Sequence, residues 1–207
     1  MKKPLEMRLL PQGASEIRAE TNDGVTRLSG YGAVIGQVSE DLGGFREIIA
    51  PGAFDGVLDR GDQVVEFNHS DLALLGRKSS GTARFKVDER GLHYEVDLPD
   101  TGAGRDVGEL VRRGDVVGSS FRFIVDTDKW EMKDGEELRT IVKVAEVFEA
   151  GPVVSPAYPD TTVAERGLEE FRSANPAPSE GAEGDETARS ARVAGMRRRV
   201  ELAELEA

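Results

Sequence analysis

Turn-forming residues interrupt this sequence along most of its length, and they limit what the chain can fold into. The 207 residues include 24 glycines and 9 prolines, which separate short segments of alternating apolar and polar residues. Such segments form strands joined by tight turns, as at the NDG of residues 22–24 and the KDG of residues 133–135. The pattern predicts a mainly β protein with a few helices. A small β-barrel surrounded by helices fits it best.

One helix is predicted over residues 104–113. Val107, Leu110 and Val111 are spaced so that they share one helical face. Gly114 follows the last helical position, where glycine commonly ends a helix. This helix leads directly into a segment that alternates like a strand.

The composition changes near the C-terminus and predicts three regions. Residues 1–172 form the compact β domain. Residues 173–186 are rich in Pro, Ala, Ser, Gly and Glu, which cannot bury a core, so we expect a disordered linker. Residues 187–207 have helix-forming residues with spaced apolar positions such as Val193 and Met196, which predicts an amphipathic helix on a tether.

Charge and residue usage exclude several classes of function. The formal net charge is -12 and no segment forms a basic domain, which argues against direct nucleic-acid binding as the main task. The chain has no cysteine and only two histidines, without a His-x-x-His spacing, so a metal-dependent hydrolase is disfavoured and no cofactor is expected. The N-terminal residues lack the continuous apolar segment of a secretory signal, so none is expected, and no apolar run is long enough to span a bilayer.

Two adjacent serines, Ser119 and Ser120, begin the strand-like segment VVGSSFRFIV of residues 116–125. A serine at a strand end offers a fixed hydroxyl, which becomes a nucleophile when a base lies beside it. Gly-Ser-Ser is also ordinary turn chemistry, so the serines alone do not establish a catalyst. Of the two histidines, His69 follows an apolar run at a polar strand end, whereas His93 lies within a regular strand pattern. His69 is therefore the better candidate base.

The segment IVKVAEVFEAG offers two candidate acids, Glu146 and Glu149. In a regular strand these two side chains point to opposite faces, so at most one of them meets His69. We expect the serine and His69 to lie side by side on adjacent strands. A glutamate near a strand end is often only solvated, and the pattern leaves the choice between the two open.

Many segments of this chain, in one order, resemble the prohead protease family of tailed bacteriophages. They include GYGAVIG, FNHS followed by LLGR, VRRGDVVGSSFRF, VFEAG and PAYPDT. That family is distantly similar to the herpesvirus capsid maturation proteases. The resemblance implies their fold, a β-barrel surrounded by helices.

The resemblance also implies a role for each candidate residue. His69 matches the family's general base, and Ser120, directly before the Phe-x-Phe strand, matches its nucleophile. Glu149 matches the acid that holds the imidazole. Ser119 occupies a position that is often apolar in the family, and the double serine leaves the choice between Ser119 and Ser120 open. The sequence departs from the family at Gly151, where a serine is usual.

The implied function is that of a serine endopeptidase of capsid maturation. It would act inside the assembling prohead, in the host cytoplasm, on the scaffold portion of the major capsid protein. No cofactor, metal, nucleic-acid partner or membrane partner is expected. Self-cleavage, the cleavage-site sequence, a homodimer and the oxyanion donors stay open. The alternative is a non-enzymatic capsid-assembly or scaffold protein on the same fold. The enzyme requires the Ser120 and His69 side chains to meet, and the scaffold does not.

Overall fold

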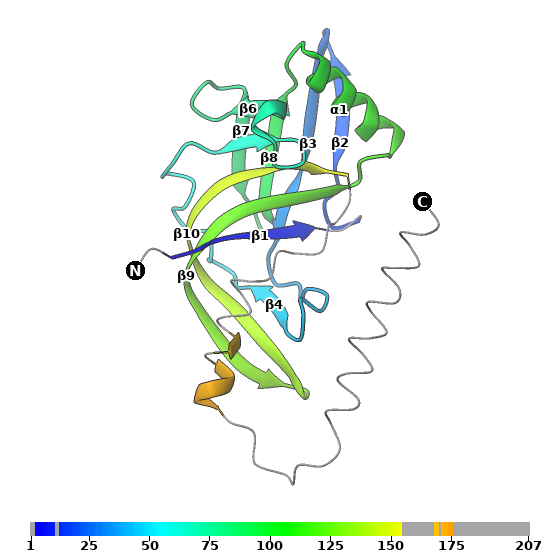
Figure 1. The fold of residues 1–207 in the computed structure, drawn as a ribbon. Helices are drawn as coiled ribbons and strands as arrows, with labels where there is room; N and C mark the ends of the chain where they lie inside the picture. The colour runs from blue at the N-terminus through cyan, green and yellow to red at the C-terminus, as the bar shows by residue number, and fades with distance from the viewer. Residues whose placement is uncertain (1–2, 11–12, 155–167, 170, 176–207) are drawn as a thin grey trace, which may run out of the picture. The chain divides into compact units, whose positions relative to one another are not determined.

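The computed structural model describes residues 3–10, 13–154, 168–169 and 171–175 (Figure 1). The chain divides into two compact units, residues 1–168 and 169–207, and the strands of the described residues belong to the first. Residues 171–174 are helical. Residues 176–186 of the predicted linker and the whole predicted helix of residues 187–207 lie outside the described residues. No helix in the described part of the chain is long and apolar enough to cross a membrane.

The described strands form two sheets, here called sheet A and sheet B. Sheet A has the order β1 (Leu5–Leu10), β9 (Gly118–Lys133), β10 (Glu136–Val153), β5 (Val64–Glu66) and β6 (Leu74–Arg77), and β4 (Arg46–Ile49) also pairs with β10. Sheet B has the order β2 (Arg18–Asn22), β3 (Val25–Val34), β8 (Gly91–Asp97) and β7 (Ala83–Val87).

The predicted mainly β class is confirmed, but the structure does not show the predicted barrel surrounded by helices. In neither sheet does the strand order return to its first strand, so the sheets are not closed. Turn spacing and alternation specify strands, whereas closure depends on which edge strands pair with each other. That pairing cannot be read from local patterns.

The β9–β10 hairpin is the longest feature of the fold and bends along its length (Figure 1). Its turn lies at the predicted KDG, where Asp134 and Gly135 have φ angles of 54° and 83°. Positive φ at both central residues is typical of the tight turns that match strand twist. The pairing of the two strands contains several register shifts, and one of them re-aims a candidate site residue.

The core lies between the inner faces of the two sheets. Sheet A contributes side chains such as Val65 and Phe121, and sheet B contributes Leu28 and Tyr94. Each of these side chains is at most 1% exposed. Burying an aliphatic or aromatic side chain of this size contributes about 1.5–3 kcal/mol relative to leaving it in water. Because strand residues alternate, the inward Phe121 places its neighbour Ser120 on the outer face of sheet A.

Helix α1 (Gly102–Arg113) confirms the predicted helix and begins two residues earlier than expected. The Thr101 side chain accepts a hydrogen bond from the backbone N–H of Gly104, which caps the N-terminus. Gly114 ends the helix with a φ angle of 81°, a left-handed conformation that glycine adopts without strain. Val107 and Val111 bury one face of the helix in the core. The helix thus fixes the point at which β9 starts.

A network of nearly buried charges attaches the edge strand β1 to the rest of sheet A. Arg8 donates to Glu47 on β4 at 2.9 Å and to Glu6 at 2.8 Å. Arg139 on β10 donates to the same two carboxylates, at 3.0 Å and 2.6 Å. Buried ions are tolerated when each has partners of opposite charge with good hydrogen-bond geometry. The network holds β1 against β9, where Leu9 pairs with Ser120.

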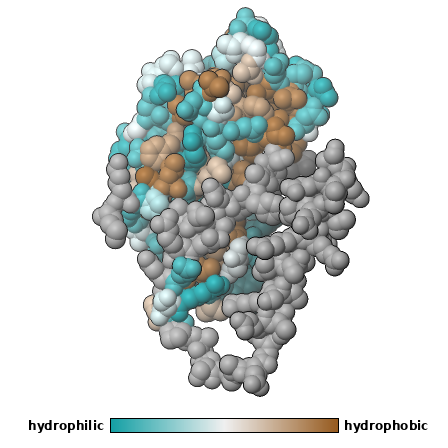
Figure 2. Space-filling model, in the orientation of Figure 1, coloured by the Kyte–Doolittle hydropathy of each residue, from teal (hydrophilic) through white to brown (hydrophobic). Residues whose placement is uncertain are grey.

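The upper part of the face shown in Figure 2 mixes apolar and polar residues. Several large apolar side chains are exposed, among them Leu72, Leu74, Val25 and Val87. Leu72 belongs to η1 (Asp71–Ala73), a short 3-10 helix that follows His69.

Candidate active site

The backbone around His69 adopts an uncommon conformation. Asn68 and His69 have φ angles of 52° and 56°, in the left-handed region that asparagine and histidine enter more readily than most residues. The Asn68 N–H donates to the carbonyl of Pro152 at 3.1 Å, and its side-chain oxygen accepts from the N–H of Val154 at 2.9 Å. These two bonds fasten the loop after β5 to the end of β10.

The structure brings His69 and Glu149 together. The Nδ1 atom of His69 lies 3.0 Å and 3.1 Å from the two carboxylate oxygens of Glu149. Because a carboxylate oxygen accepts hydrogen bonds, Nδ1 is the donor in this pair, and in the neutral imidazole Nε2 then holds the lone pair. The Nε2 atom is buried and has no hydrogen-bond partner among the described residues. The pair therefore presents an oriented imidazole whose basic nitrogen is free to take a proton.

A β-bulge determines which glutamate reaches the histidine. Glu146 pairs with Ile124 and Glu149 pairs with Arg122, with a register shift between Val147 and Glu149. Directly opposed residues of an antiparallel pair point to the same face, and Ile124 and Arg122 are two positions apart on β9. Both glutamates therefore lie on the outer face of sheet A. The expectation that they point to opposite faces is wrong, because the bulge adds a residue and re-aims Glu149.

Arg122 and Glu66 extend this cluster across three strands. The Nε atom of Arg122 donates to Glu149 Oε2, and its Nη2 atom donates to Glu66 Oε2 at 2.9 Å. Burial raises the pKa of the Glu66 carboxyl, and the charge of Glu149 adds to this, while Arg122 opposes it. Neither Glu66 nor Arg122 is among the candidate residues that the sequence pattern selected. Strand alternation could have indicated Arg122, because it lies two residues after Ser120 and so shares its face of the strand.

The two serines point in opposite directions. The Ser119 hydroxyl lies 2.8 Å from the hydroxyl of Tyr94 in the core, and the Ser119 N–H donates to Ser15 Oγ at 2.9 Å. Burial raises the pKa of Tyr94, so this phenol stays protonated. Ser120 lies on the outer face with Arg122, and its hydroxyl donates to the carbonyl of Arg8 at 3.0 Å. Of the two serines, only Ser120 shares a face with the cluster around His69.

Ser120 and His69 are not on adjacent strands, contrary to expectation. Ser120 is on β9 and His69 follows β5, and β10 lies between these two strands. Gly151 of β10 is directly opposite Ser120. A Cβ atom at Gly151 would lie 2.2 Å from the carbonyl oxygen of Glu66, so the close approach of β5 leaves no room for a side chain there. The Ser120 hydroxyl is bonded to Arg8 in this structure, and not to His69.

The sequence profile of the caudovirus prohead serine protease family matches residues 14–174. The chain belongs to this family. No curated protein sequence matches the chain. The solved structure of the bacteriophage T4 capsid assembly protease matches with a TM-score of 0.47 and 10% sequence identity, covering 75% of this chain and 100% of that one.

Two other residues of this prohead protease family member, His93 and Arg77, lie outside the cluster around His69. The His93 ring makes a T-shaped contact with the ring of Tyr31, with centroids 5.0 Å apart. Arg77 pairs with Asp62 at 2.7 Å. Neither contacts the His69–Glu149 pair, which leaves that pair as the candidate acid–base unit.

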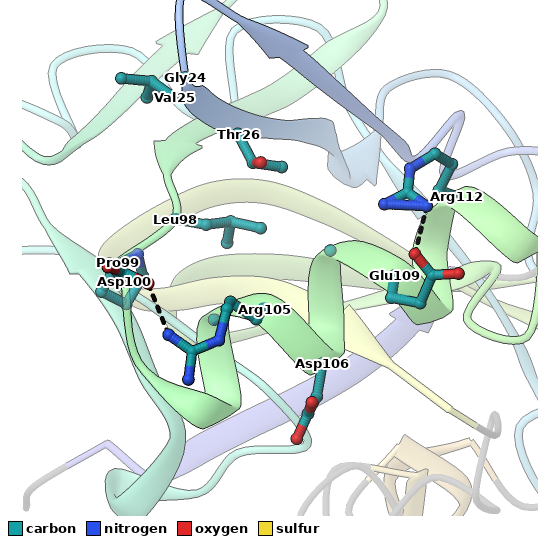
Figure 3. Close-up of a pocket in the computed structure, with 12 residues that line it drawn as sticks. Gly24, Val25, Thr26, Leu98, Pro99, Asp100, Arg105, Asp106, Glu109 and Arg112 are labelled. Atoms are coloured by element: carbon teal, nitrogen blue, oxygen red, sulfur yellow. Dashed lines mark hydrogen bonds and ion pairs between the residues drawn. The ribbon is translucent and has the colours of Figure 1, made fainter.

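A pocket of about 690 Å³ lies between helix α1 and the turn that joins β2 to β3 (Figure 3). Four of its charged lining residues form exposed ion pairs, Arg105 with Asp100 at 2.5 Å and Arg112 with Glu109. Exposed pairs of this kind contribute little to stability and mark no chemistry by themselves. None of the candidate catalytic residues lines this pocket.

Proposed function

We propose that the chain is a serine endopeptidase that cleaves the scaffold portion of the phage major capsid protein during prohead maturation. Membership of the prohead serine protease family supports the reaction class. The observation that carries the assignment of roles is the His69–Glu149 pair, with Nδ1 bonded to the carboxylate and Nε2 unoccupied among the described residues. The site of action in this proposal is the interior of the assembling prohead, in the host cytoplasm.

In the proposed mechanism, Ser120 Oγ attacks the carbonyl carbon of the scissile peptide bond while His69 Nε2 takes the hydroxyl proton. The resulting imidazolium gives this proton to the leaving amine, and an acyl-enzyme remains. His69 then takes a proton from water, which attacks the ester, and the imidazolium returns this proton to Ser120 Oγ as the acid is released. Glu149 holds the imidazole in the tautomer that leaves Nε2 free and stabilises the imidazolium.

The mechanism requires that Ser120, which is fully buried in this structure, become accessible to substrate and that its hydroxyl turn. Ser120 must turn from the Arg8 carbonyl toward His69 Nε2, across the position of Gly151, which has no side chain. Catalytic hydrogen bonds are often absent from the free enzyme and form only when substrate binds. A substrate that displaces the Arg8 contact would complete the site.

Co-expression with the major capsid protein tests the proposal through two adjacent variants. Ser120→Ala should abolish cleavage, because loss of the nucleophile typically costs several orders of magnitude in rate. Ser119→Ala should reduce cleavage only modestly, because Ser119 bonds Tyr94 in the core. Intact-mass spectrometry of both proteins measures the outcome. Undiminished cleavage with Ser120→Ala, or its loss with Ser119→Ala alone, would contradict the assignment.

A further inference from the structure

We propose that Arg122 is a positioning residue for the His69–Glu149 pair and that the negative charge of Glu66 offsets the effect of the Arg122 charge on proton uptake by the pair. The inference rests on the proposed function, because it assigns a task to residues around the proposed base. It starts from the contacts of one guanidinium group with two carboxylates on two different strands.

The geometry places Arg122 between the two acids. Its Nε atom bonds Glu149 on β10, and its Nη2 atom bonds Glu66 on β5 at 2.9 Å. The side chains of Glu149 and Glu66 are 1% and 7% exposed, and that of Arg122 is 27% exposed. A planar guanidinium can hold two acceptors in fixed directions, which a lysine ammonium cannot do. Arg122 therefore fixes the orientation of the carboxylate that orients His69.

The charged groups near the His69–Glu149 pair lie on β9, β5 and η1. Arg122 faces it from β9 and Glu66 from β5, while Asp71 of η1 faces Glu66 and helps to raise its pKa. Met7 and Leu9 of β1 pair with Arg122 and Ser120 and carry no charge. Among these neighbours Arg122 is therefore the cation, and Glu66 and Asp71 are the acids whose charge opposes it.

This arrangement predicts shifts of opposite sign for two substitutions. The His69 ring and the Glu149 carboxylate lie within hydrogen-bond distance, so a change of charge beside one of them acts on both. Arg122→Gln removes a positive charge and makes proton uptake easier. Because the base must be neutral, the acidic limb of the kcat/KM profile should move to higher pH, by about one pH unit. Glu66→Gln removes a negative charge and should move the limb to lower pH.

Two further variants separate charge from geometry. The double variant Arg122→Gln/Glu66→Gln removes one charge of each sign, so its acidic limb should return toward that of the wild type. Arg122→Lys keeps the charge but loses the fork that holds two carboxylates. Its acidic limb should stay near that of the wild type, while kcat/KM falls on the order of tenfold or more because Glu149 and His69 are less well oriented.

The experiment measures initial rates of capsid protein cleavage against pH for the full chain and these variants. Arg84→Gln is the matched control, since Arg84 also bonds two carboxylates, Glu95 at 2.7 Å and Asp97 at 2.9 Å, on sheet B. It should leave the acidic limb unmoved. Circular dichroism reports folding, and if Arg122→Gln does not fold, Glu66→Gln and Arg122→Lys still decide the outcome.

A second measurement does not depend on activity. In the Ser120→Ala background, NMR can follow the titration of His69, with His93 as the internal reference, because the chain has only two histidines. The His69 midpoint should move in the same directions as the acidic limb. If the wild type cleaves nothing and the midpoints still move, the proposed protease function is wrong and the electrostatic link stands. Midpoints that do not move, or that move in one direction for both single variants, overturn the inference.

Discussion

Replacement of Gly151 by alanine tests the geometry of the candidate site most directly. The added Cβ atom would lie 2.2 Å from the carbonyl oxygen of Glu66 and 3.1 Å from its nitrogen. These are backbone atoms, so no side-chain rotation can relieve the contact. Either β10 or β5 must move.

The size of the effect follows from this distance. Ordinary Cβ contacts begin near 3.4 Å, so the strands must separate by the difference from 2.2 Å, which is 1.2 Å. Overpacking of this kind costs about 1–3 kcal/mol. For a chain of this length each kcal/mol lowers Tm by about 2–4 °C, which predicts a drop of about 2–12 °C. Because Glu66 leads to His69 within three residues, a displacement of about 1 Å should also lower kcat/KM on the order of 100-fold.

Differential scanning calorimetry and capsid protein cleavage measure the two effects. Gly118→Ala is the matched control, because Gly118 is a buried glycine on the neighbouring strand whose Cβ atom would meet Val153 Cγ2 at an ordinary 3.4 Å. Its Tm should change by about 2 °C or less. If Gly151→Ala kept the Tm and activity of the wild type, β5 would not approach β10 as described, and the argument about the site would fail.

Two further predictions concern the residues that hold the imidazole. Glu149→Gln should lower kcat/KM by roughly 100- to 10,000-fold, which is less than the loss in Ser120→Ala, because the orienting charge is lost but the nucleophile remains. Glu146→Gln should leave kcat/KM unchanged. The reverse result would exchange the roles of Glu149 and Glu146. Asn68→Ala should destabilise the fold by about 1–2 kcal/mol, because alanine tolerates a φ angle of 52° poorly and cannot accept from the Val154 N–H. Asn68→Asp keeps the acceptor and should stay near the wild-type Tm, so equal Tm losses in both would refute this account.

The sequence by itself determined the local elements and the chemical candidates. Alternation and glycine-containing turns predicted a mainly β chain, the turn at residues 133–135 and the helix that ends at Gly114, and all three are present. These features depend on neighbours a few residues apart, so short patterns encode them. The motif resemblance selected His69, Ser120 and Glu149, and their catalytic roles stay predictions.

Only the tertiary structure decided how these residues face one another. The bond from Ser119 to Tyr94 leaves Ser120 as the serine on the outer face, and the bulge in β10 turns Glu149 toward a histidine 80 residues away. The sequence pattern predicted neither the strand between Ser120 and His69 nor the two open sheets. Strand order, register shifts and edge pairing are set by packing between segments far apart in the chain. A one-residue change in register reverses the face of every following side chain, and no local pattern specifies where that change occurs.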